Sequence, residues 1–207
     1  MYAKYFKRII DFALSLCAVI VLSPLFLVLI LLGMIYMRGN PFFLQERPGR
    51  DEKIFKLIKF RSMDNRKNSE GKLLPDAIRL NRYGRILRST SLDELPELIN
   101  ILKGDMSIVG PRPLRVYYLP WYTDIEKHRH DVRPGLTGWA QVNGRNNLTW
   151  DKRLMLDVEY VSNISFLFDV RIIFMTVACV IKCSNLNVDS VDEGRLDEIR
   201  RAKAEIE

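Results

Sequence analysis

One long apolar stretch dominates the N-terminal part of the chain. It runs from Ile9 to Met37, and Asp11 is its single charged residue. A helix rises about 1.5 Å per residue, so this stretch is long enough to cross the hydrocarbon core of a bilayer. It is too long for the apolar part of a signal peptide, and no small-residue cleavage site follows it. We therefore expect it to remain in the mature protein as a membrane anchor.

Ser23 and Pro24 lie at the centre of this stretch. Proline removes a backbone hydrogen bond and disfavours helical geometry in the residue before it, which predicts a kink or a break here. Basic residues flank both ends of the stretch: Lys4, Lys7 and Arg8 before it, and Arg38, Arg47, Arg50 and Lys53 after it. The positive-inside rule then places both ends in the cytoplasm, which a straight span cannot satisfy.

Two structures for the anchor stay open. The first is a re-entrant helix that enters the membrane, turns at Ser23-Pro24 and leaves on the same side. It requires the Ser23 hydroxyl or other protein groups to bond the carbonyls that the break frees. The second is an ordinary spanning helix with a kink.

The rest of the pattern predicts an α+β fold that is mostly helical with a few short strands. Alternating apolar and polar positions indicate strands over residues 42–45 and 54–60, and residues 64–76 are polar and should form a loop. Helices are expected over residues 79–100, 114–129, 150–161 and 166–182, the first of them interrupted near Pro96.

This pattern divides the chain into three parts. Residues 1–40 form the membrane anchor, and residues 41–183 form a cytoplasmic catalytic domain with interfacial helices. Residues 184–207 form a charged C-terminal tail, for which we expect a frayed helix without chemistry.

The net charge of the chain limits the classes of partner that we expect it to bind. Its 207 residues carry a formal net charge of +7, which favours nucleic acid, anionic lipid or phosphorylated small molecules. The chain has no recognisable nucleic-acid-binding module and it has a membrane segment, so we expect no nucleic-acid partner. Its three cysteines fall in apolar helical stretches without a disulfide framework, which suits a reducing compartment.

The adjacent carboxylates Asp93 and Glu94 are the first candidates for catalysis. One carboxylate can attack or accept a proton while the other holds a hard cation such as Mg2+. The same residues also complete a helix capping box that begins at Ser91, which is a purely structural explanation. Pro96 weakens that explanation, because its missing N–H leaves the Leu92 carbonyl unbonded. On these residues alone, both interpretations stay open.

The second candidate is the segment GPRP, residues 110–113. Pro111 and Pro113 steer the residues before them into extended conformations, so Arg112 is presented on stiff backbone. A guanidinium held in this way suits bidentate binding of a phosphate, although an arginine paired with a carboxylate in a surface turn has the same sequence. Other cations beside turns or on the strand edge would help to surround two phosphates: Lys59, Arg61, Arg85, Arg88, Arg133 and Arg145.

Three motifs occur in order along the chain: KFRSM at 59–63, SLDELPELINILKGDMSIVGPRP at 91–113 and VRPGLTGWAQVNGR at 132–145. Together with an apolar N-terminal segment centred on Ser23-Pro24, they closely resemble the monotopic phosphoglycosyl transferases, a family of bacterial sugar transferases. The resemblance extends from about residue 4 to residue 183. It is closest to the small single-domain members, and among these to the enzymes that begin oligosaccharide assembly for protein glycosylation.

The resemblance implies an activity. A sugar 1-phosphate would pass from a UDP-sugar to polyprenol (undecaprenyl) phosphate, giving a polyprenyl-diphospho-sugar and UMP with Mg2+ as cofactor. This is the first membrane step of glycoconjugate and polysaccharide biosynthesis, at the cytoplasmic face of the bacterial inner membrane. Inner-membrane lipids and downstream glycosyltransferases are the further partners that it implies, and the oligomeric state stays open.

The resemblance also assigns residues. It implies a covalent aspartyl sugar-phosphate in which Asp93 is the nucleophile and Glu94 binds the metal. The basic positions that line the active site of the family correspond here to Lys59, Arg88, Arg112 and Arg145. Ser23, Pro24, Pro111 and Pro113 correspond to its structural and membrane positions.

Two other functions stay open at this point. Asp93 could act as a general base for direct attack by the lipid phosphate, with no covalent intermediate. Alternatively, the chain could be a non-enzymatic, membrane-bound scaffold whose basic face senses anionic lipids.

Overall fold

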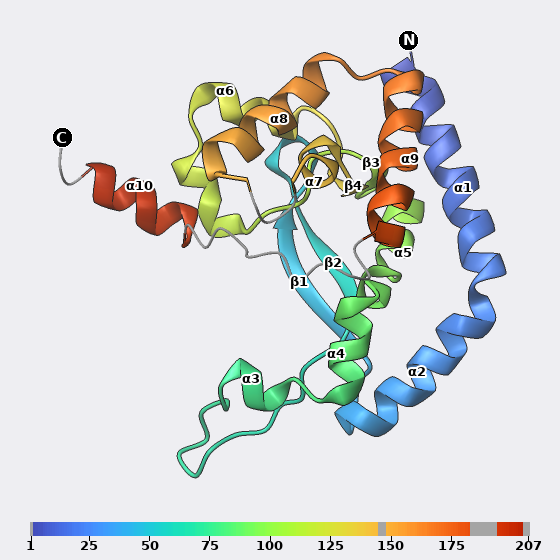
Figure 1. The fold of residues 1–207 in the computed structure, drawn as a ribbon, viewed down its shortest axis with the longest axis vertical. Coiled ribbons are helices and arrows are strands. Elements are labelled where there is room, and N and C mark those ends of the chain that lie inside the picture. Colours follow the sequence, from blue (N-terminus) through green and yellow to red (C-terminus); the bar gives the residue numbers. More distant parts are fainter. Residues whose placement is uncertain (1, 145–147, 183–193, 205–207) are drawn as a thin grey trace. The chain divides into compact units, whose positions relative to one another are not determined.

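The computed structural model describes residues 2–144, 148–182 and 194–204 (Figure 1). Its strands are β1 (Phe42–Pro48), β2 (Ile54–Phe60), β3 (Ser107–Val109) and β4 (Gly135–Thr137). Its α-helices are α1 (Lys7–Val21), α2 (Ser23–Met37), α3 (Asp76–Arg79), α4 (Arg82–Ser89), α5 (Glu97–Lys103), α6 (Asp124–Lys127), α7 (Trp139–Val142), α8 (Trp150–Ser162), α9 (Phe166–Lys182) and α10 (Leu196–Ala204). The predicted class, α+β and mostly helical with a few short strands, is confirmed.

The chain forms two compact units. The first consists of Met1–Asp11, Glu46–Phe55 and Gly104–Glu207, and the second of Phe12–Gln45 and Lys56–Lys103. Each is held by its own buried contacts.

The apolar N-terminal stretch is broken at its centre, as predicted. Helix α1 ends at Val21 and α2 begins at Ser23, and the segments on the two sides of the break are bent by 65° (Figure 1). Pro24 has no N–H for the carbonyl of Ile20, and the Ser23 hydroxyl donates to that carbonyl instead, at 2.8 Å. The hydroxyl therefore satisfies the group that the proline leaves free.

Among the described helices, none is by itself long and apolar enough to cross a bilayer. The bent pair Tyr2–Val21 and Ser23–Met37 reaches that length and composition only when its two halves are taken together. The re-entrant structure stays a prediction.

Helix α2 packs on α4 in the second unit. The Tyr83 hydroxyl donates to the carbonyl of Leu29 at 2.9 Å, and the Tyr83 ring stacks on Tyr36 with a centroid separation of 5.3 Å. In the same unit, buried Asn100 ties α5 to the backbone of β2: its side chain accepts from the N–H of Ile58 and donates to the carbonyl of Lys56. These bonds fix α4 and α5, the two helices on either side of Asp93.

In the first unit, β3 and β4 form a parallel pair, with Ser107 opposite Gly135 and Val109 opposite Thr137. No Cβ fits at Gly135, because it would lie 2.1 Å from the backbone nitrogen of Gly110. The pair was not predicted, because strands of three residues are too short to show alternation.

Charged groups are buried beside this pair. Asp11 accepts from the Ser107 hydroxyl at 2.6 Å and from the Ile108 N–H at 3.2 Å. Asp169 of α9 pairs with Lys7 at 2.6 Å and accepts from the Tyr160 hydroxyl at 2.7 Å. The one acidic residue of the apolar stretch therefore binds the backbone of β3.

Other predicted elements agree with the structure to different degrees. Strand β2 and α9 have their predicted bounds, and α8 runs one residue further than predicted, to Ser162. Strand β1 extends to Pro48, beyond the predicted residue 45, because it pairs with β2. The helix predicted over residues 114–129 is wrong: Pro120 lies in a 3₁₀ segment, and Thr123 begins a new short helix with a capping box.

The described part of the C-terminal tail also differs from its prediction. Residues 196–204 form α10, which is packed rather than frayed. Leu196 is 1% exposed, in a core cluster with Tyr118 and Leu154. Arg200 forms a two-pronged ion pair with Glu126, with both distances 2.6 Å.

A buried ion pair in the first unit gives a stability prediction. Arg129 and Asp157 are 2% and 3% exposed, and their closest contact is 2.8 Å. We expect Asp157→Asn to lower the free energy of unfolding by about 3 to 5 kcal/mol, because it leaves the guanidinium buried without a counter-charge. Urea titration followed by tryptophan fluorescence measures this. Asp124→Asn is the matched control, since Asp124 is fully exposed and its loss should leave the midpoint unchanged; equal midpoints for the two variants would contradict the prediction.

Candidate active site

The Asp93-Glu94 pair lies on a turn between α4 and α5. It forms a single 3₁₀ turn, Leu92–Glu94, preceded by Ser91 in the left-handed region at φ 56° and ψ 17°. A non-glycine residue in that conformation costs about 1–2 kcal/mol, and such outliers cluster at functional sites.

The structural explanation from sequence is wrong, because Ser91 makes no capping hydrogen bond with its side chain. The expectation for Leu92 also needs correction: its carbonyl accepts from the N–H of Leu95 at 3.3 Å. The tighter 3₁₀ bonding replaces the bond that Pro96 cannot make, and α5 begins at Glu97.

Lys59, in β2, lies between two carboxylates. Its ammonium is 2.7 Å from Oε1 of Glu94 and 3.1 Å from Oε1 of Glu97. The Lys59 and Glu94 side chains are 16% and 19% exposed, whereas Glu97 is only 3% exposed. The ion pairs thus join β2 to the turn that carries Asp93 and Glu94, and to the first turn of α5.

Glu97 is a site residue that sequence reasoning missed. Its signal was present, because it follows Glu94 by three residues, a spacing that places side chains on one face of a helix. Pro96 lies between them and predicts a break in the helix, so the sequence did not predict a shared face.

Arg88 approaches the same turn from α4. Its Nε donates to the Ser62 hydroxyl at 2.9 Å. The contact depends on Gly84, because a Cβ there would lie 1.8 Å from the carbonyl oxygen of Ser62. Lys59, Arg88, Asp93 and Glu94 are therefore brought together within the second unit.

The GPRP segment belongs to the first unit, where three hydrogen bonds to its backbone hold it. The N–H of Gly110 donates to the Thr137 carbonyl at 2.9 Å, and the N–H of Gly135 donates to the Pro111 carbonyl at 2.9 Å. Nη2 of Arg129 donates to the carbonyl of Arg112 at 2.7 Å. The Arg112 side chain is exposed while Pro111 and Pro113 are buried, and the predicted phosphate position Arg145 lies outside the described residues.

Comparison with known proteins identifies the family. The family model described as bacterial sugar transferase matches residues 2–183. This chain belongs to the bacterial sugar transferase family. The family named from the motifs is thereby confirmed.

The chain aligns with most of the length of some relatives and with less than half of the length of others. It is 47% identical over 175 residues to the uncharacterized sugar transferase EpsL of Bacillus subtilis, covering 84% of this chain and 87% of EpsL. It is 37% identical over 193 residues to the exopolysaccharide production protein ExoY of Sinorhizobium fredii, covering 84% of each. It is 40% identical over 186 residues to the UDP-glucose:undecaprenyl-phosphate glucose-1-phosphate transferase of Escherichia coli, covering 84% of this chain but 40% of that protein.

Electrostatics in this sugar transferase make Asp93 unusual. Burial raises the pKa of the Asp93 carboxyl above its ordinary value, and Glu94 raises it further, while Lys59 and Arg88 offset part of the increase. A higher pKa makes a carboxylate more basic and a better nucleophile, and the two cations favour an approaching phosphate. The site suits attack on, or proton transfer near, an anionic phosphate.

The carboxylates of Asp93 and Glu94 fit Mg2+ if substrate phosphates and water supply the remaining ligands. The described residues contain no group of three or more metal-binding side chains. Mg2+ is, however, usually bound by one or two carboxylates together with substrate phosphates and water. Asp93 and Glu94 supply such oxygens, and Lys59 can remain paired with Glu97 if Glu94 turns to a metal.

The raised pKa can be measured without turnover. Dicyclohexylcarbodiimide modifies protonated carboxyls, and peptide mass spectrometry reports the modification of Asp93 as a function of pH. We expect a midpoint above the ordinary 3.8. Arg88→Gln should move it to still higher pH, because removing a nearby cation disfavours the charged carboxylate. Arg82→Gln, an exposed change on the same helix, should not move it, and an Asp93 midpoint near 3.8 would contradict the prediction.

Proposed function

We propose that this chain transfers a sugar 1-phosphate from a UDP-sugar to polyprenol phosphate, releasing UMP. The observation that carries the proposal is Asp93, half buried on a strained turn between Lys59 and Arg88. The printed activity of the Escherichia coli relative, from UDP-glucose to undecaprenyl phosphate, supports the same substrate pair. That relative is longer than this chain, and its activity comes to this chain as part of the proposal.

The proposed chemistry has two displacements at one phosphorus atom. A carboxylate oxygen of Asp93 attacks the sugar-linked phosphorus of the UDP-sugar, forming an acyl phosphate O–P bond. The bond from that phosphorus to the oxygen of UMP breaks, and UMP leaves with the electron pair. An oxygen of polyprenol phosphate then attacks the same phosphorus, and the carboxylate of Asp93 leaves unchanged. The product is the polyprenyl-diphospho-sugar.

Cations are needed because the nucleophile and its target are both anionic. We assign Lys59 and Arg88 to the reacting diphosphate on the strength of their place beside Asp93. Glu94 would hold Mg2+, which would neutralise phosphate charge when bound. Arg112 and Arg145 are proposed as further phosphate contacts, Arg112 because its backbone is fixed at Gly110, Pro111 and its own carbonyl.

The bent apolar pair supports a membrane site of action. We propose that α1 and α2 form the re-entrant anchor in the bacterial inner membrane, with the catalytic residues on the cytoplasmic face. A water-soluble nucleotide sugar and a lipid-embedded phosphate must meet at headgroup level, and a shallow anchor holds the chain there. Such a reaction would serve polysaccharide biosynthesis or, as the resemblance suggested, protein glycosylation.

Trapping tests the covalent step. Incubation with Mg2+ and a panel of UDP-sugars labelled in the sugar, without polyprenol phosphate, should release up to one equivalent of UMP. The label should remain on the peptide that contains Asp93. Direct attack with Asp93 as a general base predicts neither result, because nothing leaves until the lipid phosphate arrives. Turnover without a trapped label, together with kinetics that require both substrates at once, would show that Asp93 is a base.

Variants assign the two carboxylates in the same assay. Asp93→Asn should abolish labelling and turnover with the fold intact. Asp93→Glu should also fail, because one more methylene moves the attacking oxygen out of line. Glu94→Gln should lower the rate and the response to Mg2+ together, whereas Glu70→Gln, at an exposed loop position, should leave both unchanged.

Cysteine labelling in intact cells tests the anchor. Cys17, Cys179 and Cys183 are first replaced by serine, and Lys4→Cys or Lys53→Cys is then introduced on either side of the anchor. We expect both positions to resist an impermeant maleimide until the cells are opened. Reaction of Lys4→Cys from outside while Lys53→Cys stays protected would establish a spanning helix. Replacing Ser23-Pro24 by Leu-Leu should restore the continuous helix and produce that second pattern.

A further inference from the structure

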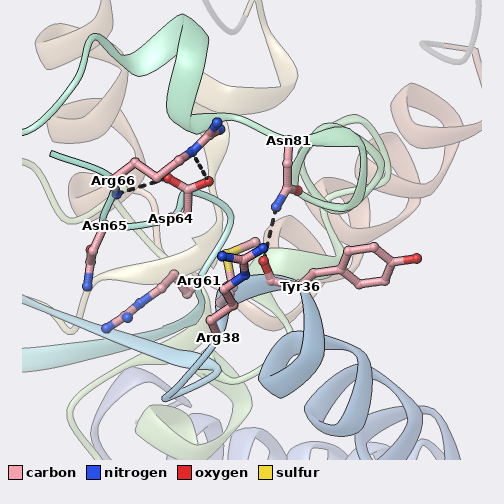
Figure 2. A pocket seen from close by; sticks show the side chains of 8 residues that line it. Tyr36, Arg38, Arg61, Asp64, Asn65, Arg66 and Asn81 are labelled. Carbon is pink, nitrogen blue, oxygen red and sulfur yellow. Dashed lines mark hydrogen bonds and ion pairs between the residues drawn. The ribbon is translucent and has the colours of Figure 1, made fainter. Parts of the chain in front are cut away.

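A second basic site lies in the second unit, at the end of α2. It is a cavity of about 440 Å³ (Figure 2). Its lining comes from the last turn of α2, the end of β2, the loop after it and the start of α4: Tyr36, Met37, Arg38, Arg61, Asp64, Asn65, Arg66 and Asn81. We call this cavity the arginine pocket.

The charges in the arginine pocket do not cancel. Arg66 is paired with Asp64 at 2.8 Å, and its guanidinium also donates to the carbonyl of Ile78. Within the part of the chain that the structure describes, the guanidinium groups of Arg38 and Arg61 have no hydrogen bond or ion pair. Both side chains line the arginine pocket, which Figure 2 shows from close by. The net charge of two matches a phosphate monoester, which carries nearly two negative charges at neutral pH.

The rim of the pocket is fixed before any ligand arrives. Arg38 ends α2 in the left-handed region, at φ 51° and ψ 45°, and its N–H donates to the carbonyl of Met34. Asn81 donates to the carbonyl of Tyr36 at 3.3 Å, and the Tyr36 ring is stacked on buried Tyr83. An arginine in a conformation that favours glycine is an unusual choice, and it directs the side chain from a rigid base. Little ordering of the backbone would oppose binding.

The position of the pocket favours a lipid over a soluble phosphate. The surface of α2 exposes apolar side chains along its length, with Leu27 59%, Leu31 48% and Ile35 69% exposed. If α2 lies in the bilayer, as the proposed function holds, its final turn emerges at the depth of the lipid phosphates. Tyr36, 51% exposed at that end, is a residue type enriched at this depth.

We infer that the arginine pocket binds the phosphate of a lipid phosphomonoester, with Arg38 and Arg61 as its two cationic contacts. The proposed acceptor, polyprenol phosphate, belongs to this chemical class, and so does phosphatidic acid. The inference rests on the proposed function only for the depth of α2. It requires no chemistry at Asp93.

Binding can be measured apart from turnover. Full-length protein carrying Asp93→Asn, in neutral detergent micelles, is titrated with dioctanoyl phosphatidic acid by isothermal calorimetry. Dioctanoyl phosphatidylcholine and inorganic phosphate are titrated in parallel. We expect saturable binding of the phosphatidic acid and none of the phosphatidylcholine. Arg38→Gln and Arg61→Gln should each weaken binding about 10-fold, the effect of losing one charge-assisted hydrogen bond. Arg82→Gln, at an exposed position of α4 that does not line the pocket, should have no effect.

Each other outcome overturns the inference in a distinct way. Equal weakening by Arg82→Gln would indicate attraction to a generally basic surface. Unchanged binding in both pocket variants would place the lipid elsewhere. Inorganic phosphate that binds as tightly as the lipid, with the same dependence on Arg38 and Arg61, would indicate a site for a soluble phosphate. Since the Asp93→Asn protein turns over nothing, failure of the proposed transfer reaction leaves these results untouched.

Discussion

The ion pairs of Lys59 hold the turn that carries Asp93 and Glu94 in place. One ammonium from β2 meets Glu94 on the turn and Glu97 on α5, and Glu97 is almost fully buried. Removing one partner of a buried ion pair typically costs about 3–5 kcal/mol, because the remaining charge has lost both water and counter-charge. That constraint fixes three segments at once, and Asn100 reinforces it by bonding the backbone of β2 on both sides of Leu57. A turn fastened in this way can keep Ser91 in an unfavourable backbone conformation and present Asp93 in a defined direction.

The first unit uses the same physical device for a different purpose. Arg129 and Asp157 are a buried pair, and the guanidinium of Arg129 has a donor left for the carbonyl of Arg112. The guanidinium of Arg129 therefore fixes the backbone at Arg112, while the Arg112 side chain is exposed. Arg129 is thus committed to structure, so a count of arginines and lysines overstates the number that can bind phosphate.

Lys59 and Arg61 show how sharply the environment separates two neighbouring cations. Regular alternation would place them on one face of a strand. Strand β2 ends at Phe60, and the N–H of Arg61, the next residue, donates to the carbonyl of Pro41, the residue before β1. Lys59 consequently enters the ion pairs beside Asp93, and Arg61 lines the arginine pocket.

The sequence by itself determined the features that depend on local chemistry. Pro24 lacks an N–H wherever it lies, so the break in the apolar stretch was predictable, and the long periodic segments gave α8, α9 and β2 nearly to the residue. The motifs gave the family and the Asp93-Glu94 pair. Only the tertiary structure determined the features that depend on contacts between residues far apart in the sequence. It showed that Ser91 does not cap a helix, that Glu97 shares Lys59, that β3 pairs with β4, and that Arg38 and Arg61 line one pocket. The reason is physical: backbone propensity acts over a few residues, whereas ion pairs and pockets form between side chains that only folding brings within a few ångströms.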